Sequence, residues 1–362
     1  MQKRRISYSR IMMVTFLVIV LIFGIDFFKR NAAARDPNNS LKISVVDTAS
    51  TTEPQVSGAE TDVSQTENDY VKAGIDEDKY YSLEKSESEI YLGELAVVNA
   101  EYPCRFPDIE TLLVNIFENK EGDSYKLSYL THTAHKSIIS PLNSMMNDFY
   151  SLYGHNDVTI VTAYTSYAAQ NEAYTAPSGD VITSENSIMA GNSEHHTGYA
   201  IDLKLVSDAG KISAFDGTGD YAWITQNCYK YGFIIRYPEG KENSTGVSYQ
   251  PAHLRYVGVP HSYIMHENGF TLEEYINHLK QYVYGYDHLK YKLYGYDYEI
   301  YYVPIDGQNT IVPVPSDKAY GISGNNMDGF IVTICSQETT VSNNQPNQPA
   351  QTESPASTNS ES

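Results

Sequence analysis

Two polar stretches limit which part of this chain can fold around an apolar core. Residues 31–85 are rich in Ser, Thr, Asp, Glu and Asn, and residues 336–362 are similarly polar and contain prolines. Segments with so few apolar side chains cannot bury enough surface to offset the conformational entropy that folding removes. We therefore expect both stretches to be disordered, which leaves the residues between them for the folded part.

The first 30 residues have the pattern of an export segment. A basic cluster that includes Lys3, Arg4 and Arg5 precedes an apolar, uncharged run at residues 11–25. This arrangement is typical of an amino-terminal membrane anchor or of a signal peptide. We expect residues 1–30 to form a cytoplasmic tip and an uncleaved single-pass anchor, so that the bulk of the chain lies outside the cytoplasm. Cleavage after an alanine in "NAAAR" is the alternative and would give a secreted protein.

Charge and cysteine content argue against a nucleic-acid partner and against two structural roles for cysteine. The chain has 25 Lys and Arg against 45 Asp and Glu, and its formal net charge of −20 repels the phosphate backbone of nucleic acids. Its three cysteines, Cys104, Cys228 and Cys335, have no C-x-x-C spacing. We therefore expect no nucleic-acid partner, no disulfide scaffold and no zinc site built from thiolates.

The region between the polar stretches mixes helical and strand-like patterns, which predicts the α+β class. Apolar residues have helical spacing at residues 106–119 and 137–154, whereas residues 157–164 and 199–205 alternate as in strands. Further along, a helical pattern ends near Gly232 and continues into a strand.

Helix-end signals and a change of texture divide the later part of the chain. A helix is expected to end at Gly269, and Thr271 with Glu274 forms a capping box that opens the next helix. Beyond it, strand-like alternation and abundant Tyr and Val predict a small β module over residues 284–335, which leaves residues 86–283 as the main domain. The tyrosines of the module could form a ligand platform, although paving a half-exposed sheet is their commoner role.

Three residues in two separate motifs could together bind a metal ion. His195 and Asp202 occur in "GNSEHHTGYAIDL", where Gly198 allows a turn between a histidine on a loop and an aspartate on a strand. Zinc accepts imidazole nitrogen and carboxylate oxygen, and its catalytic sites use three protein ligands and leave one position for water. His253 in "YQPAHLRYVG" is the natural third ligand, whereas His196 directly follows His195 and is expected to point elsewhere. From these residues alone, a hydrogen-bonded surface loop remains the alternative.

The same motifs carry a resemblance to a known family. The stretch "SEHHTGYAID", residues 193–202, matches the motif S-x-H-x-x-G-x-A-x-D of the VanY-type zinc D-alanyl-D-alanine carboxypeptidases. The stretches "LGELAVVNAEYP", "VTAYTSYAAQ" and "YGFIIRYPEGKENSTGVSYQPAHLRYVG" resemble that family in the same order, so the resemblance covers residues 90–279. It implies the small α+β fold shared by these D,D-peptidases and the hedgehog signalling domain. It also implies a peptidoglycan stem peptide ending in D-Ala-D-Ala as the partner, and Zn2+ as the cofactor.

The resemblance further implies roles for individual residues and a location. The expected zinc ligands are His195, Asp202 and His253, and the residues expected to contact the substrate are Ser193, Tyr164 and Gln170. Together with the amino-terminal segment, the resemblance implies a protein on the extracytoplasmic face of a bacterial membrane.

The chain departs from the family pattern at positions on which catalysis would depend. Relatives have Glu-Pro-Trp-His where this chain has "QPAH", so Gln250 stands at the glutamate position and Ala252 replaces a tryptophan. A carboxylate can take the proton of the attacking water and an amide cannot, and such assistance typically contributes about 10² to 10⁴ in rate. Thr165 stands where the family motif Ser-Gly-Tyr-Arg-Ser has its arginine, and loss of one oxyanion donor can cost about 10² to 10³ in rate. Arg236 and Arg255 lie where relatives also have arginine, so neither is a replacement.

These departures leave three functional hypotheses. We expect a cell-surface protein of the VanY type that acts on or binds peptidoglycan stem peptides, with catalysis impaired by Gln250 and Thr165. A fully active D,D-carboxypeptidase is one alternative. A non-enzymatic surface binding protein is the other.

Overall fold

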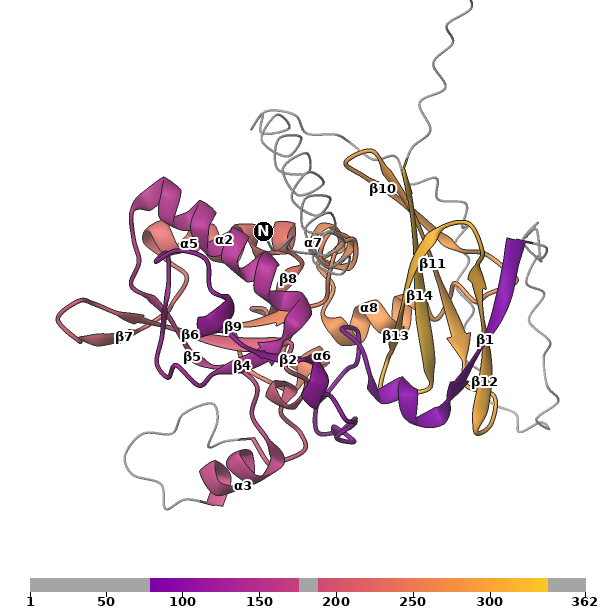
Figure 1. Ribbon diagram of the computed structural model, residues 1–362, viewed down its shortest axis with the longest axis horizontal. Helices are drawn as coiled ribbons and strands as arrows, with labels where there is room; N and C mark the ends of the chain where they lie inside the picture. The colour runs from indigo at the N-terminus through magenta and orange to yellow at the C-terminus, as the bar shows by residue number, and fades with distance from the viewer. Residues whose placement is uncertain (1–78, 176–187, 338–362) are drawn as a thin grey trace, which may run out of the picture. The chain divides into compact units, whose positions relative to one another are not determined.

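A computed structural model of the protein describes residues 79–175 and 188–337 (Figure 1). The predicted anchor at residues 1–30, most of the predicted linker and the tail from residue 338 onward lie outside these ranges. Among the helices in the described ranges, none combines the length and the apolar character that a membrane crossing requires.

A mostly antiparallel sheet forms the centre of the main domain. Its strands follow the order β3, β5, β6, β9 and β8; β7 also pairs with β6, and β3 is parallel to β5. The bounds are Lys126–Leu127 for β3, Val158–Thr162 for β5, Ala200–Val206 for β6, Ile212–Ala214 for β7, Phe233–Tyr237 for β8 and Gln250–Tyr256 for β9. With the helices described below, this sheet confirms the predicted α+β class.

Helix α2 (Lys136–Tyr153) packs on this sheet through a stripe of apolar side chains (Figure 1). The stripe recurs every three or four residues, which places its members on one side of the helix. One buried cluster contains Ile138, Leu142, Met145 and Phe149 of α2 together with Ile160, Ile201 and Leu203 of the sheet. At the end of the helix Gly154 takes a φ of 72°, a left-handed conformation that glycine adopts without steric cost. The helix predicted at residues 137–154 is therefore confirmed.

The helix predicted at residues 106–119 is wrong. These residues form two 3₁₀ turns, η3 (Glu110–Leu112) and η4 (Phe117–Asn119), on either side of strand β2 (Leu113–Asn115). Strand β2 pairs with β4 (Thr133–His135), which directly precedes α2. Pairing with a later segment of the chain has overridden the helical spacing, because short apolar runs suit either structure.

The helix ends predicted in the second half of the main domain are confirmed. Helix α5 (Ala222–Asn227) continues into η7 (Cys228–Tyr231), which ends at Gly232 immediately before β8. Helix α7 (His261–Asn268) ends at Gly269, and Thr271 with Glu274 forms the capping box of α8 (Leu272–Leu279). The remaining helices of the described ranges are η2 (Glu87–Tyr91), α3 (Tyr167–Thr175), η5 (Glu194–Thr197), η6 (Gly219–Tyr221) and α6 (Glu242–Thr245).

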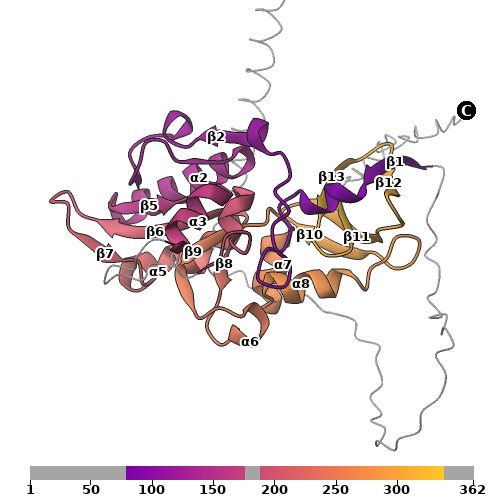
Figure 2. The same ribbon diagram turned by 90° about the horizontal axis from the view of Figure 1, so that it is seen from below.

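The carboxyl-terminal segment forms strands as predicted, but it also recruits a strand from the beginning of the described chain. Strands β10, β11, β14 and β13 form one antiparallel sheet in that order (Figure 1), and β12 pairs with β1 (Figure 2). Their bounds are Tyr80–Ser86 for β1, Leu289–Leu293 for β10, Tyr296–Pro304 for β11, Asn309–Pro315 for β12, Ala319–Gly324 for β13 and Gly329–Gln337 for β14. Residues 80–85 and 336–337, which the sequence assigns to a disordered linker and a disordered tail, are therefore ordered. The polar sequence of β1 does not indicate a strand, which forms because β12 pairs with it along its whole length.

Helices α7 and α8 pack against this second sheet. Ile264 of α7 and Ile276 of α8 share a buried cluster with Ile300 of β11 and Ile331 of β14. His261 of α7 lies in the same contact: Nδ1 is 2.8 Å from the Tyr275 hydroxyl, and Nε2 is 3.0 Å from Oγ1 of Thr333.

We expect His261 to make the folded protein sensitive to acid. Burial lowers the pKa of His261 to about 3, so the folded state does not bind the proton that the unfolded chain takes up below about pH 6.5. Because the folded pKa lies below the unfolded one, the contribution of His261 to the free energy of unfolding is complete above about pH 6.5 and is lost as the pH falls toward 3. The His261→Gln variant lacks this group, so the stability difference between wild type and variant should shrink by about 2 kcal/mol from pH 7.5 to pH 5. Urea unfolding at both pH values tests this, and a difference that is independent of pH would contradict it.

Candidate metal centre

Strand pairing brings Asp202 and His253 together. Asp202 of β6 and His253 of β9 are direct partners in an antiparallel ladder. Side chains of such partners leave the sheet on the same face and lie next to each other. Ile201 and Leu203, on either side of Asp202, belong to the core cluster on the other face. The alternation of residues 199–205 therefore gives each residue the face that the sequence predicts.

A glycine turn brings His195 to the same place. Helix η5 carries His195 and ends at Gly198, which has a φ of 74°. A Cβ at this position would lie 2.9 Å from Leu113 Cδ2 and 3.1 Å from the backbone nitrogen of His135. Both the conformation and the close approach therefore favour glycine, as the sequence predicts for the turn before β6.

The three predicted ligands converge in the structure. Nε2 of His195 lies 3.1 Å from Oδ2 of Asp202, and Nδ1 of His253 lies 2.8 Å from Oδ1 of the same carboxylate. Each residue offers one ligand atom, these atoms all lie within 4.8 Å of one another, and all three residues are buried. The hydrogen-bonded surface loop, the alternative that the sequence left open, does not describe this arrangement.

The charge and the donor atoms of the trio suit a divalent cation. Burial alone would raise the pKa of the Asp202 carboxyl, but His195 and His253 beside it hold that pKa below its ordinary value. Burial would lower the pKa of His253, whereas Asp202 and Glu194 raise it to about 9. The trio thus favours a bound proton between its carboxylate and its imidazoles, and a metal cation can take the place of that proton. Two imidazoles and one carboxylate are a donor set that zinc accepts in sites with an open fourth position.

A cleft of about 440 Å³ opens beside the trio and contains the predicted position of the catalytic base. Asp202, His253 and Gln250 all line it, and Ala252 lies between the last two in the chain. Lys204, two residues after Asp202 on the same strand, also lines the cleft and brings a positive charge into it. The cleft is completed by Ser128, Tyr129, Val161, Thr162, Leu203, Tyr249 and Pro251.

Thr165 and Ser193 lie next to His195 through backbone contacts. The Thr165 N–H donates to the His195 carbonyl at 3.2 Å, and the Thr165 hydroxyl donates to the Ala163 carbonyl at 3.4 Å. The Ser193 hydroxyl accepts from the His195 N–H at 3.3 Å and caps η5. Neither residue lines the cleft. The structure therefore places Thr165 beside the trio. Its side chain carries no positive charge, unlike the arginine of the family pattern.

Tyr164 and Gln170 also lie outside the lining of the cleft. Tyr164 is half-buried, and its N–H donates to the Thr133 carbonyl at 2.9 Å. Gln170 is buried, and its Nε2 donates to the Ile188 carbonyl at 2.8 Å. Their contacts with a substrate stay predictions, as does that of Ser193.

His196 uses both ring nitrogens away from the trio. Its Nε2 accepts from the Gly191 N–H at 3.0 Å, and its Nδ1 donates to the Thr165 carbonyl at 2.6 Å. These two hydrogen bonds agree with the expectation that His196 is not a metal ligand.

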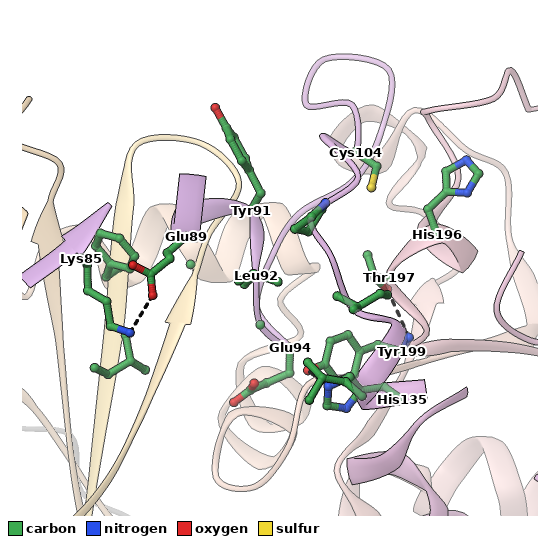
Figure 3. Close-up of a pocket in the computed structure, with 17 residues that line it drawn as sticks. Lys85, Glu89, Tyr91, Leu92, Glu94, Cys104, His135, His196, Thr197 and Tyr199 are labelled. Atoms are coloured by element: carbon green, nitrogen blue, oxygen red, sulfur yellow. Dashed lines mark hydrogen bonds and ion pairs between the residues drawn. The ribbon is translucent and has the colours of Figure 1, made fainter. Parts of the chain in front are cut away.

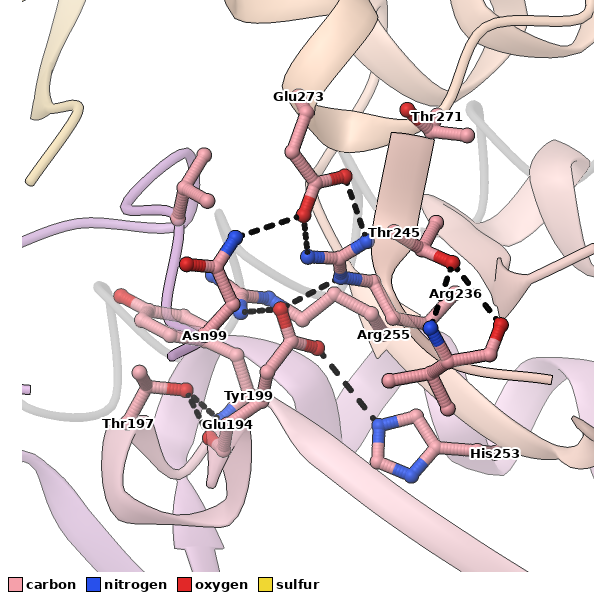
Figure 4. Close-up of polar contacts among 12 residues, drawn as sticks. Asn99, Glu194, Thr197, Tyr199, Arg236, Thr245, His253, Arg255, Thr271 and Glu273 are labelled. Atoms are coloured by element: carbon pink, nitrogen blue, oxygen red, sulfur yellow. Dashed lines mark hydrogen bonds and ion pairs between the residues drawn. The ribbon is translucent and has the colours of Figure 1, made fainter. Parts of the chain in front are cut away.

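A buried network of four charged residues adjoins the trio at His253, and sequence reasoning missed it (Figure 4). Glu194 pairs with Arg236 and Arg255, and Arg236 pairs in turn with both carboxylate oxygens of Glu273. Burial alone would raise the pKa of the Glu194 carboxyl, but the two guanidiniums hold it well below its ordinary value. The two arginines are therefore occupied by carboxylates, which agrees with the prediction that neither replaces the missing arginine at Thr165.

The sequence contained one signal for this network. Glu194 lies between Ser193 and His195 in the motif itself, so a glutamate there is fixed in place by the same turn as the candidate ligand. Nothing in the sequence indicates that it is buried, because its partners Arg236, Arg255 and Glu273 are distant in the chain.

A second cavity, of about 280 Å³, is lined in part by His196 and Thr197 but by none of the trio (Figure 3). Glu94, Cys104, His135 and Tyr199 line it together with Gly324 and Phe330 of the second sheet. His195, Asp202, His253 and Gln250 are absent from its lining. We therefore place the candidate site at the cleft beside the trio.

The chain is similar to carboxypeptidases and dipeptidases that act on D-Ala-D-Ala. The family profile of VanY, described as D-alanyl-D-alanine carboxypeptidase, matches residues 131–259. A D-alanyl-D-alanine carboxypeptidase of Enterococcus faecium is 34% identical over 250 residues, which are 69% of this chain and 77% of that protein. The bifunctional D-Ala-D-Ala dipeptidase and D-Ala-D-Ala carboxypeptidase VanXYC of Enterococcus gallinarum is 38% identical over 133 residues, which are 35% of this chain and 70% of that protein.

Among solved structures, the vancomycin resistance D,D-dipeptidase VanXYg in complex with a D-Ala-D-Ala phosphinate analog matches with a TM-score of 0.61 and 32% identity. The match covers 71% of this chain and 99% of the VanXYg chain. The fold of this chain is therefore that of a D,D-peptidase, and the resemblance carried by the motif at residues 193–202 is confirmed.

Proposed function

Because this chain belongs to the VanY family of D-alanyl-D-alanine carboxypeptidases, we propose that it is a zinc protein that binds peptidoglycan stem peptides ending in D-Ala-D-Ala and hydrolyses them slowly. The observation that carries the proposal is the convergence of His195, Asp202 and His253 at the edge of a cleft that also contains Gln250. A retained ligand set argues for metal binding. The amide at the position of the base argues for weak catalysis.

The cleft suits a peptide that ends in a carboxylate. Lys204 lines the cleft and forms no ion pair within the described ranges, so it is available to a ligand carboxylate. Tyr129 and Tyr249 are exposed residues on the cleft wall and offer flat apolar surfaces to the body of a peptide. The likeness to VanXYg, solved with a D-Ala-D-Ala phosphinate analog, supports D-Ala-D-Ala as the recognised end of that peptide.

Each polar residue of the site has a limited role in peptide hydrolysis. A zinc ion held by His195, Asp202 and His253 would supply Lewis acidity for water activation and for polarisation of the scissile carbonyl. The amide of Gln250 can orient an attacking water by a hydrogen bond, but it has no site basic enough to take the proton. The hydroxyl of Thr165 already donates to a backbone carbonyl and brings no positive charge toward a developing oxyanion. Removal of the proton from water and stabilisation of the oxyanion therefore both lack the charged side chain that the family pattern has at these positions.

We also propose that the chain is held on the extracytoplasmic face of a bacterial membrane by its first 30 residues. The basic cluster before the apolar run at residues 11–25 supports this location. Peptidoglycan stem peptides are found on that side of the membrane, so location and substrate are consistent.

Metal and peptide binding can be tested together. We expect zinc at 100 times its dissociation constant to stabilise the purified protein by about 2.7 kcal/mol, because the folded state alone assembles the three ligands. A peptide ending in D-Ala-D-Ala should bind to the zinc-loaded form and not to the form treated with a chelator, as measured by calorimetry.

The variants His253→Ala and His155→Ala separate a site effect from a general one. His253 belongs to the trio, whereas His155 is a half-buried histidine that pairs with Asp220. Zinc stabilisation should disappear in the first variant and persist in the second. A wild-type protein that zinc does not stabilise would overturn the proposal.

A further inference from the structure

Glu194 is a fully buried carboxylate whose two oxygens have different surroundings (Figure 4). Oε1 lies 2.6 Å from Nε of Arg236 and 3.0 Å from Nη1 of Arg255. Oε2 lies 3.6 Å from Nε2 of His253 and has no hydrogen-bond partner within the described ranges. One oxygen is thus fixed by the two arginines, and the other is directed at a candidate metal ligand.

His253 presents one ring nitrogen to each carboxylate. Nδ1 lies 2.8 Å from Asp202 and is the nitrogen that faces the trio. Nε2 faces Glu194 and is buried without another partner in the described part of the chain. An imidazole that binds a metal through one nitrogen carries its proton on the other, and metal-binding histidines almost always donate that N–H to a carboxylate, a carbonyl or a water.

We propose that Glu194 is a positioning residue of the metal centre, whose Oε2 accepts the Nε2–H of His253 and so keeps Nδ1 turned toward Asp202. The inference rests on the proposed zinc binding and extends it to a residue outside the ligand set. The gap of 3.6 Å needs to shorten by only a few tenths of an ångström to reach the usual range of such a bond.

The network behind Glu194 explains how the carboxylate keeps its orientation. Arg236 also donates to both oxygens of Glu273, which accepts in addition from Nδ2 of Asn99 at 3.1 Å. Arg255 also donates through Nη2 to two backbone carbonyls, those of Glu94 at 2.9 Å and Ala96 at 2.8 Å. Because both arginines are held from behind, Glu194 cannot turn Oε2 away from His253 without breaking its contacts with them.

The variant Glu194→Gln tests the proposal because it keeps the shape of the side chain and removes one acceptor. If the amide oxygen faces the arginines, the NH2 group opposes the N–H of His253. We expect Co2+ and Zn2+ to bind about 10 to 100 times more weakly than in the wild type, as measured by competition with a chelator. The visible absorption of the Co2+ form should also change, because the ring that donates to the metal has lost its partner. Both readouts are independent of hydrolytic activity.

The variant Glu273→Gln is the matched control. It removes a carboxylate from the same buried network, but Glu273 does not face His253. Metal affinity and the Co2+ spectrum should remain close to those of the wild type in this variant. Equal losses in both variants would assign the effect to general weakening of the network and overturn the proposal.

A third variant covers the case in which Glu194→Gln does not fold. Glu194→Asp keeps the charge between the arginines but shortens the side chain by one methylene, so it should fold and still bind Co2+ at least about 10 times more weakly. Unchanged binding by this variant or by Glu194→Gln would overturn the role of Glu194 while leaving the proposed function intact. Absence of metal binding in the wild type would instead overturn the proposed function.

Discussion

We expect the Gln250→Glu variant, loaded with zinc, to release D-alanine from a stem pentapeptide about 10² to 10⁴ times faster than the wild type. Gln250 opens β9 and lines the same cleft as Asp202 and His253, so a carboxylate introduced there needs no change of the backbone. Glutamate has nearly the shape of glutamine, and it adds a basic site that can take a proton from water and return it to the leaving amine. The rate is measured by D-alanine release at a fixed, saturating zinc concentration.

The variant Gln250→Ala separates loss of a base from loss of a hydrogen bond. An amide that only orients water contributes far less than a general base, so this variant should stay near the low rate of the wild type. Zinc content and unfolding temperature should be the same in all three proteins, because Gln250 is not one of the candidate ligands. A wild type as fast as Gln250→Glu would show that another group supplies the base, and the proposal of weak catalysis would fail.

The site could be predicted from the sequence to the extent that it depends on local spacing. Gly198 and the alternation of β6 decide where His195 and Asp202 point, and both signals lie within ten consecutive residues. The residue pattern offered His253 only as a candidate third ligand, and the resemblance supported that choice, because the pairing of His253 with Asp202 joins residues 51 positions apart in the chain. The amide at Gln250 and the missing arginine at Thr165 were visible for the same reason, as departures from a known motif.

Features that depend on contacts between distant segments could not be predicted from residue patterns. The polar sequence of β1 lacks the composition of a buried strand, yet β12 supplies its hydrogen bonds and orders it. The apolar spacing of residues 106–119 fits a helix, but β4 draws part of it into a ladder. Burial of Glu194 could not be predicted from the sequence either, because a charged residue is buried only where partners of opposite charge contact it, and its partners are distant in the chain. In each case contacts with a distant segment have therefore outweighed the structure that the local sequence favours.

We expect the Arg236→Met variant to lose about 3 to 5 kcal/mol of stability, because it leaves two buried carboxylates without their shared partner. Arg236 is fully buried and pairs with Glu194 and Glu273 at once. Without the Arg236 charge, the effect of burial is opposed only by Arg255 and His253, so the pKa of Glu194 should rise and the carboxyl should tend to bind a proton. Urea unfolding of the chelator-treated protein measures the loss without a contribution from zinc.

The partly exposed pair of Lys241 and Glu274 provides the comparison for this result. Their ion pair, at 2.8 Å, is nearly as short as the 2.6 Å pair of Arg236 with Glu194, but about a third of each side chain is open to solvent. Removal of an exposed pair costs at most about 1 kcal/mol, so Lys241→Met should unfold at nearly the same urea concentration as the wild type. If both variants lost the same small amount, water would have to reach Glu194 and Glu273, and the dry, rigid network on which the orientation of His253 depends would not exist. A large loss confined to Arg236→Met would instead show that the stability of the main domain and the geometry of its metal centre depend on the same buried charges.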